Sequence, residues 1–310
     1  MTPTHKQTPK VTPYTPIEVA GIGELLWDIF PSHKRVGGAP ANFAFHCRQL
    51  GIMAAPVSSV GKDELGESLL QSLSELDVVI SHIHRSHDFN TGTVQVTLSP
   101  DGKPSYQIAK NTAWDHIPFT PELKTLANSL AAVCFGSLGQ RSALSRATIH
   151  TFLESMPADS IKIFDVNLRQ NDFNRELIEQ SLRLATILKL SDEELPILAI
   201  YFNLPGNPAS QLQSLRTAFD LDLIAYTRGA EGSLLVSARE SDDHPGVTCQ
   251  PVDSVGAGDS FTAAMCTGLL RGWPLSQVNQ FANEIAAFVC SQAGATPSLP
   301  DHLVRERSHS

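Results

Sequence analysis

Short apolar runs alternate along this chain with segments in which apolar residues recur at helical spacing, and the alternation begins at Ile17. The runs expected to form strands are residues 17–22, 161–164, 221–226 and 232–236, and the expected helices are residues 39–50, 63–76, 175–188, 258–270 and 275–290. Strands that alternate with helices predict an α/β fold, with a mostly parallel sheet covered by helices on both faces. In such a sheet, ligands bind at the carboxyl ends of the strands.

One segment departs from this pattern. Val94, Val96 and Leu98 alternate with polar residues, and beyond residues 99–102 the alternation resumes at Tyr106. The pattern predicts a β-hairpin with one apolar face, which does not belong to a strand–helix–strand unit. We therefore expect a small antiparallel sheet that projects from the main body.

The composition argues against several classes of protein. Among 310 residues, 32 Asp and Glu outweigh 23 Lys and Arg, and the net charge of -9 argues against a nucleic-acid-binding surface. Acidic proteins still bind phosphate through backbone dipoles, so anionic substrates are not excluded. No apolar run approaches the ~18 residues that a membrane helix needs.

The chain is expected to be a soluble cytoplasmic protein. Its five cysteines are irregularly spaced and odd in number, which favours reduced thiols. The first 16 residues contain four prolines and no hydrophobic segment, so they are expected to form a disordered leader rather than a signal peptide.

The segment from Asp253 to Phe261 carries the clearest chemical signal. Two glycines flank Ala257, Asp259 follows at once, and a helical pattern begins there. Glycine allows a close approach between backbone and ligand, and the free N–H groups at a helix start form a site for an anion. A carboxylate beside a phosphate is electrostatically unfavourable, so its presence indicates a function. One such function is to accept the proton of an attacking hydroxyl group. The segment indicates phosphoryl transfer, although an ordinary helix start with an acidic first turn would look similar.

This nine-residue run resembles the second signature of the ribokinase-like (PfkB) carbohydrate kinases, and the likeness is strongest to their fructokinase branch. The resemblance extends over most of the chain and implies a three-layer α/β sandwich at 17–306, between a leader at 1–16 and a tail at 307–310. It also implies a β-sheet lid formed mainly by about residues 24–37 and 90–112. Such a lid covers the sugar and often supplies the contact of a homodimer.

The resemblance also implies the reaction. Asp259 would be the catalytic base, and the backbone N–H groups of Gly256, Ala257 and Gly258 would form an anion hole. The γ-phosphoryl group of ATP would pass to the primary hydroxyl group of a ketohexose, with fructose favoured. ATP and Mg2+ are the expected cofactors, with K+ as a further candidate.

Four residues match the positions that contact the sugar in this family: Asp28, Gly38, Asn42 and Arg169. A carboxylate such as that of Asp28 can accept two hydroxyl hydrogen bonds at once, which suits a vicinal diol. The guanidinium group of Arg169 can bind sugar oxygens or offset phosphate charge. The alternatives are an ordinary loop aspartate at position 28 and an Asn42 side chain that faces solvent.

On the nucleotide side, the resemblance implies contacts from Ser191, Thr227, Gly229 and Asn283. Glu194 matches the glutamate that organises magnesium through water, which is reasonable because Mg2+ keeps much of its hydration shell. Ser191 stands where much of the family has Asn, and Ser191 with Glu194 also fits a capping box, so both interpretations stay open. The loop 294–298 resembles the one that, together with the position of Asp253, holds a potassium ion through backbone oxygens, so Asp253 and Ser298 are candidate ligands.

Other functions stay open as alternatives. Ribose, a nucleoside or a keto-deoxy sugar acid could replace fructose, since Arg169 also suits an acidic sugar. A non-catalytic sugar or nucleotide sensor on the same fold is disfavoured by the intact Asp259 segment. A dinucleotide-binding fingerprint fails because Leu26 stands where the third glycine is needed.

Two further features have weaker interpretations. His82, His84 and His87 invite a metal site, but no third type of ligand is obvious, so we expect them to be exposed. Trp114, which follows the hairpin, is a candidate for enclosing a sugar ring.

Overall fold

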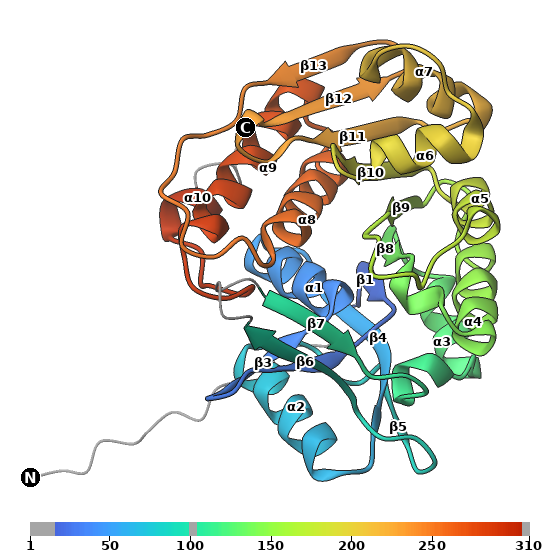
Figure 1. The fold of residues 1–310 in the computed structure, drawn as a ribbon, viewed down its shortest axis with the longest axis vertical. Helices are drawn as coiled ribbons and strands as arrows, with labels where there is room; N and C mark the ends of the chain where they lie inside the picture. Colours follow the sequence, from blue (N-terminus) through green and yellow to red (C-terminus); the bar gives the residue numbers. More distant parts are fainter. Residues whose placement is uncertain (1–15, 99–103, 306–310) are drawn as a thin grey trace, which may run out of the picture.

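The computed structural model describes residues 16–98 and 104–305. The hairpin turn expected at 99–102, residues 1–15 of the expected leader and the tail at 307–310 lie outside the described residues. Figure 1 shows a large sheet with helices on both sides and a smaller sheet in the lower half of the view. No helix in the described ranges is both long enough and apolar enough to span a membrane.

Nine strands form the central sheet, in the order β13-β12-β11-β10-β9-β8-β1-β4-β5. Their bounds are β1 Val19–Ile22, β4 Ala54–Gly61, β5 Ile83–Ser86, β8 Ala132–Gly136, β9 Ile161–Asp165, β10 Ile187–Ser191, β11 Leu223–Thr227, β12 Ser233–Ser237 and β13 Ser241–His244. The strands from β11 to β5 pair in parallel, whereas β12 and β13 form an antiparallel edge. The predicted α/β fold with a mostly parallel sheet is thus confirmed.

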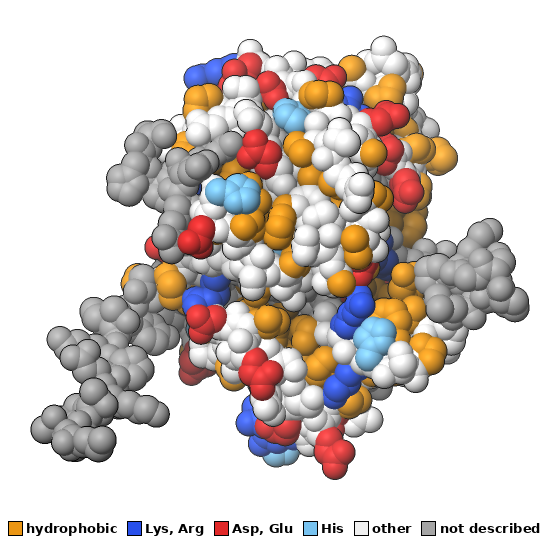
Figure 2. All heavy atoms as spheres, turned by 90° about the vertical axis from the view of Figure 1, so that its left-hand side faces the viewer, with side chains coloured by type: hydrophobic (Ala, Val, Ile, Leu, Met, Phe, Trp, Pro, Cys, Tyr) orange, Lys and Arg blue, Asp and Glu red, His pale blue; other side chains and the backbone are white. Residues whose placement is uncertain are grey.

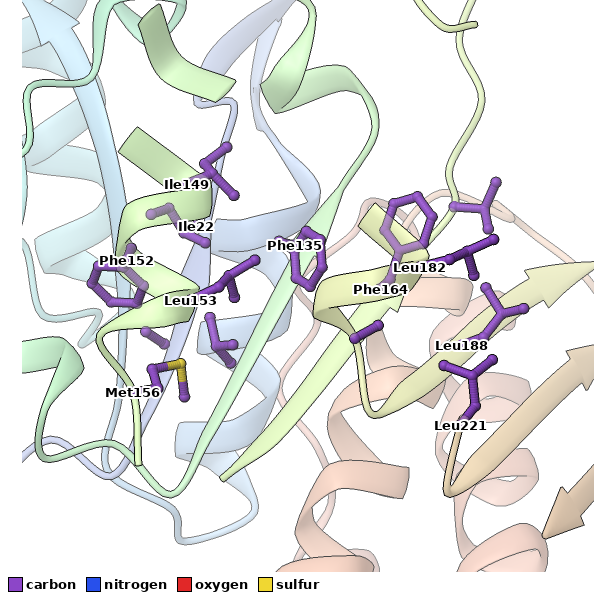
Figure 3. Packing of buried hydrophobic residues seen from close by; sticks show 14 of the residues in the cluster. Ile22, Phe135, Ile149, Phe152, Leu153, Met156, Phe164, Leu182, Leu188 and Leu221 are labelled. Carbon is purple, nitrogen blue, oxygen red and sulfur yellow. The ribbon is translucent and has the colours of Figure 1, made fainter. Parts of the chain in front are cut away.

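Helices cover both faces of this sheet, which makes three layers (Figure 1). One face carries α1 Ala39–Gln49, α8 Ala257–Leu270 and α9 Leu275–Cys290, and the other carries α3 Pro121–Ala127, α4 Ala143–Glu154, α5 Arg175–Leu184, α6 Leu195–Phe202 and α7 Pro208–Ala218. The short α10 Asp301–Arg305 is the last helix among the described residues. Successive side chains of a strand point to opposite faces, so Val19 and Ala20 enter different cores. Figure 3 shows the core on the α4 and α5 side, where Phe135 of β8 lies between Phe152 and Leu182.

The smaller sheet has the order β3-β2-β6-β7. Its strands are β2 Leu26–Ile29, β3 Lys34–Gly37, β6 Gly92–Leu98 and β7 Pro104–Ile108, which fall within the two segments expected to form the lid. The predicted hairpin is confirmed, because β6 and β7 pair antiparallel. The sheet as a whole is mixed rather than antiparallel as predicted, since β2 pairs with β6 in parallel and with β3 antiparallel. Helix α2 Glu64–Glu75 supports the sheet through Leu69 and Leu73, which pack with Leu25 and Trp27.

The helix expected over 175–188 is shorter than predicted. Helix α5 ends at Leu184, and strand β10 begins at Ile187. Ile187 and Leu188 pack into the cores on opposite faces of the sheet, as in a strand buried on both sides. Apolar residues recur from Leu182 to Leu190 with few interruptions, and so short a stretch does not distinguish a buried strand from the end of a helix, which explains the wrong boundary.

Candidate active site

Helix α8 begins at a glycine in the left-handed conformation. Gly256 has φ 80, and a Cβ atom at this position would lie 2.6 Å from the carbonyl oxygen of Ala295. No side chain in the described part of the protein caps the helix. The N–H group of Ala257 makes a long hydrogen bond of 3.3 Å to the carbonyl oxygen of Ser254. The first turn of α8, which includes Gly258, therefore offers N–H groups and a positive dipole end that suit an anion.

Asp259 lies in this first turn and is half-buried. Asn42 of α1, which is 4% exposed, donates from Nδ2 to Asp259 Oδ2 over 2.8 Å. Removal from water raises the pKa of Asp259 to about 6, although the hydrogen bond from Asn42 opposes the rise. A carboxylate with this pKa is ionised at neutral pH and is a stronger base than an ordinary aspartate.

A buried ion pair lies behind the helix start. Lys189 Nζ of β10 donates to Asp165 Oδ1 of β9 over 3.0 Å, and Thr262 Oγ1 of α8 donates to Asp165 Oδ2 over 3.1 Å. Burial acts to lower the pKa of Lys189, but the carboxylates around it, that of Asp165 first, raise it overall. Its Nζ also lies beside Gly258, since a Cβ there would come within 3.3 Å of it. The sequence analysis gave Lys189 no role. It could have been noticed as a single charged residue between the apolar residues Leu188 and Leu190 of an expected core segment.

The residues expected on the sugar side come together near the root of the small sheet. Burial raises the pKa of Asp28 to about 6, while Arg169 and Arg35 act to lower it. Arg169 also acts to lower the pKa of Asp259, so its exposed side chain lies near both carboxyl groups. Gly38 has φ 122, and a Cβ there would meet the carbonyl oxygen of Glu24 at 2.5 Å. Asn42 faces Asp259 rather than solvent.

The expected nucleotide-side residues lie at the carboxyl ends of β10 and β11. Ser191 and Thr227 are paired neighbours in the parallel register of these strands. Gly229 begins a short 3-10 helix, with open space where a Cβ atom would lie. Glu194 Oε2 accepts from the N–H of Ser191 over 2.8 Å, and Oε1 accepts from the N–H of Leu168 over 3.0 Å. The bond from Ser191 has the form of the return bond of a capping box, but the N-cap of α6 is Glu194 itself, so the predicted capping box does not form at this helix. Each carboxylate oxygen of Glu194 keeps a second lone pair.

Asn283 is placed differently from the other expected nucleotide contacts. It is 7% exposed and donates from Nδ2 to Ser233 Oγ over 2.8 Å, in a network that includes Asn279. These bonds fasten α9 to β12. The amide nitrogen of Asn283 is thus engaged within the protein.

Asp253 joins the small sheet to the segment that leads into α8. Its Oδ2 accepts from Arg35 Nη1 of β3 over 2.8 Å and from the N–H of Gly294 over 3.1 Å, and its Oδ1 accepts from the N–H of Val255. Burial acts to raise the pKa of Asp253, but these hydrogen bonds and the charge of Arg35 lower it overall. Ser298, the other residue expected at a cation site, is exposed.

The remaining candidates lie away from this site. Trp114 is 0% exposed and packs beneath the small sheet, with the Arg141 guanidinium 3.8 Å from its ring centroid, so its ring is not available to a sugar. His84 and His87 are exposed and His82 is half-buried. Within the described ranges, no group of three or more His, Cys, Asp or Glu residues could hold a metal ion.

The face drawn in Figure 2 shows how charge is distributed over the surface. Acidic side chains are scattered across it, whereas several Lys and Arg side chains lie near mid-height, where the surface is hollowed. An acidic chain can therefore still present local positive charge.

Comparison with known proteins establishes the family. The pattern of the pfkB family carbohydrate kinases matches residues 24–302. An uncharacterized sugar kinase of Pyrococcus horikoshii is 30% identical over 296 residues, which cover 89% of this chain and 91% of that protein. Its crystal structure superposes with a TM-score of 0.80 over 93% of this chain and 97% of that one. The chain therefore belongs to the pfkB family of carbohydrate kinases.

Other relatives are named for different sugar substrates. An ATP-dependent 6-phosphofructokinase of Thermoanaerobacterium thermosaccharolyticum is 29% identical over 304 residues, which cover 92% of this chain and 91% of that protein. A fructokinase of Escherichia coli is 26% identical over 299 residues, which cover 90% of this chain and 95% of that protein. The Pyrococcus horikoshii sugar kinase also has a crystal structure in complex with ATP, with a TM-score of 0.76 over 91% of this chain and 95% of that one. The preferred sugar must be argued from the site.

Proposed function

We propose that this protein transfers the γ-phosphoryl group of ATP to the primary hydroxyl group of a ketohexose, with D-fructose as the substrate and fructose 6-phosphate and ADP as the products. One observation carries the proposal. The Asp259 carboxylate lies in the first turn of α8, held by Asn42 at 2.8 Å, beside N–H groups that suit a phosphate. A proton acceptor and an anion site are thereby adjacent.

In the proposed reaction, Asp259 accepts the proton of the sugar hydroxyl group as its oxygen attacks phosphorus. The N–H groups of Gly256, Ala257 and Gly258 stabilise the charge on the transferred phosphoryl group. The ammonium group of Lys189 lies beside Gly258 on the same side, within its ion pair with Asp165. A general base contributes ~10²–10⁴ to the rate and one anion-hole donor ~10²–10³.

ATP would lie along Ser191, Thr227 and Gly229. The residues present fit a magnesium ion that arrives with the ATP phosphates, because Glu194 keeps free lone pairs that can accept from metal-bound water. Bound Mg2+ neutralises charge on the phosphate oxygens. Asn283 would contribute to the adenine side indirectly, by fastening α9 to β12. A potassium ion at Asp253 and Ser298 would be bound through backbone oxygens, and the Asp253 carboxylate would keep its ion pair with Arg35.

The groups on the sugar side suit a polyol. The carboxyl groups of Asp28 and Asp259 lie there, with the guanidinium group of Arg169 near both and that of Arg35 near Asp28. Carboxylates accept hydrogen bonds from hydroxyl groups and guanidinium groups donate to them, so these residues can pair with the hydroxyl groups of fructose.

The test is ADP release with Mg-ATP and potassium across fructose, fructose 6-phosphate, ribose, nucleosides and keto-deoxy gluconate. We expect fructose to give the highest kcat/KM. The Asp259→Asn variant should bind ATP normally and lose at least about two decades in kcat. Near-normal turnover by this variant would contradict the mechanism.

The other outcomes separate the alternatives. Higher kcat/KM with another sugar of the panel would keep the kinase and replace fructose. Sugar binding without ADP release by the wild-type protein would instead indicate a sensor.

A further inference from the structure

Glu24 is a buried carboxyl group for which the mechanism gives no role. It lies between β1 and β2, at the root of the small sheet, and is 3% exposed. The N–H group of Ala39 donates to its Oε1 over 3.3 Å, whereas its Oε2 has no hydrogen-bond partner among the described residues. Gly139 packs against the same oxygen, since a Cβ there would lie 3.3 Å from it. A buried polar atom without a partner costs free energy and requires an explanation.

Helix α1 depends on Glu24 for the start of its first turn. Its N-cap is Gly38, which has no side chain to accept a hydrogen bond, and Glu24 provides the missing acceptor for Ala39 from outside the helix. The same turn carries Asn42, whose Nδ2 donates to Asp259 Oδ2 over 2.8 Å. Two hydrogen bonds and one turn of helix thus connect Glu24 with Asp259.

The surroundings of Glu24 favour its uncharged form. Burial raises the pKa of Glu24 to about 7, and the Asp259 carboxylate contributes to the rise, whereas the N–H group of Ala39 and the charge of Arg169 oppose it. Asp259 faces it from α8 and Arg169 from the loop that follows β9. Ionisation of Glu24 near neutral pH would place a second negative charge beside Asp259.

We propose that Glu24 is a positioning residue for Asp259: its uncharged carboxyl group holds the first turn of α1 and, through Asn42, fixes the orientation of the Asp259 carboxylate. The carboxylic acid form suits this role, because Oε1 accepts a hydrogen bond while no charge is added that would repel the transferred phosphoryl group. This inference rests on the proposed function, since it requires Asp259 to be the base.

The test compares Glu24→Ala with Glu24→Gln in steady-state kinetics from pH 5.5 to 9. Glu24→Ala removes the acceptor, and we expect kcat at pH 6.5 to fall by about 10- to 10²-fold, while KM for ATP stays within about threefold. Glu24→Gln keeps an acceptor oxygen and should stay within about threefold of wild-type kcat at that pH. The kcat of the wild-type protein should decline as the pH rises above about 7, because Glu24 then ionises. The kcat of Glu24→Gln should not show this decline.

A double-mutant cycle tests the path through Asn42. The double variant Glu24→Ala/Asn42→Ala should be no slower than the slower single variant, because both changes interrupt one path. Fully additive losses in kcat would overturn the inference. Wild-type kcat in Glu24→Ala, or the wild-type alkaline decline in Glu24→Gln, would overturn it as well.

Two controls keep the outcome clear. ATP binding by calorimetry reports whether each variant is folded, and if Glu24→Ala does not fold, the pH profile of Glu24→Gln decides. Wild-type turnover by Asp259→Asn would remove the proposed base itself. An inactive Asp259→Asn beside a fully active Glu24→Ala would contradict this inference alone.

Discussion

Lys189 and Asp165 form a charged pair within the core, directly behind the proposed anion hole. Lys189 is 8% exposed and Asp165 is 5% exposed, with 3.0 Å between Nζ and Oδ1. Loss of one partner from such a pair leaves the other charge buried and uncompensated, which costs about 3–5 kcal/mol. When both charges are removed, this cost disappears.

We therefore expect Lys189→Met to lower the free energy of unfolding by about 3–5 kcal/mol. Asp165→Asn/Lys189→Met should recover most of that loss, since neither charge remains. Urea denaturation followed by circular dichroism measures both. Arg183→Met breaks a mostly exposed pair with Glu179 and is the matched control, with an expected change below about 0.5 kcal/mol. A Lys189→Met variant as stable as wild type would show that Asp165 takes up a proton or another partner at little cost.

Single residues differ in how far the sequence alone predicts their place. The motifs that contain Asn42 and Asp259 single out two segments that do meet, and their side chains are hydrogen-bonded although 217 positions separate them. Lys189 and Glu24 were given no role. The significance of a buried charge depends on its partners, and those of Lys189 and Glu24 come from other elements of the fold.

At the scale of the element, the start of α8 depends on one backbone conformation. Gly256 has a positive φ and close contact with Ala295 of a distant loop, so an added Cβ meets both strain and backbone atoms. Gly272, just after the same helix, also has a positive φ of 68, but none of the described residues comes within 4 Å of its Cβ position. Substitution of Gly272 by alanine therefore tests the cost of the positive φ alone, whereas substitution of Gly256 adds the clash with Ala295.

We expect Gly256→Ala to lower kcat by on the order of 10², because displacement of the turn moves an anion-hole N–H group. Gly272→Ala should cost about 1 kcal/mol of stability from φ alone and leave kcat within about twofold of wild type. ADP release and thermal denaturation of both variants check this. Equal kcat values in the two variants would show that contact with Ala295 does not hold the anion hole.

The elements themselves were predicted with uneven success, for a physical reason. The helix 275–290 matches α9, and the hairpin matches β6 and β7, because each has a clear period of apolar residues. The boundary between α5 and β10 was wrong, since Ile187 and Leu188 follow the last apolar residue of the helix, Leu184, after only two residues. Whether a short apolar segment forms a strand buried on both faces depends on its pairing with neighbouring strands of the sheet, and the local sequence pattern does not show that pairing.

For the molecule as a whole, several buried groups couple folding to pH. Burial raises the pKa of Glu24 from 4.5 to about 7 and that of Asp259 from 3.8 to about 6. Over this range the folded state keeps protons that the unfolded chain has lost, so the contribution of these groups to stability falls as pH rises. Burial also lowers the pKa of His46 from 6.5 to about 4. The contribution of His46 to stability is therefore lost as the pH falls from 6.5 towards 4.

Glu24→Gln isolates one of these groups. The amide does not titrate, so the free energy of unfolding of this variant, relative to wild type, should increase from pH 5 to pH 8 by up to about 3 kcal/mol. Urea denaturation at each pH measures the difference, in which the contribution of His46 cancels. Glu193→Gln removes an exposed carboxyl group in the same way and should show no such trend. If the difference in the free energy of unfolding between Glu24→Gln and wild type did not change with pH, Glu24 would be ionised in the folded protein. That result would contradict the proposal that an uncharged Glu24 is the acceptor for helix α1.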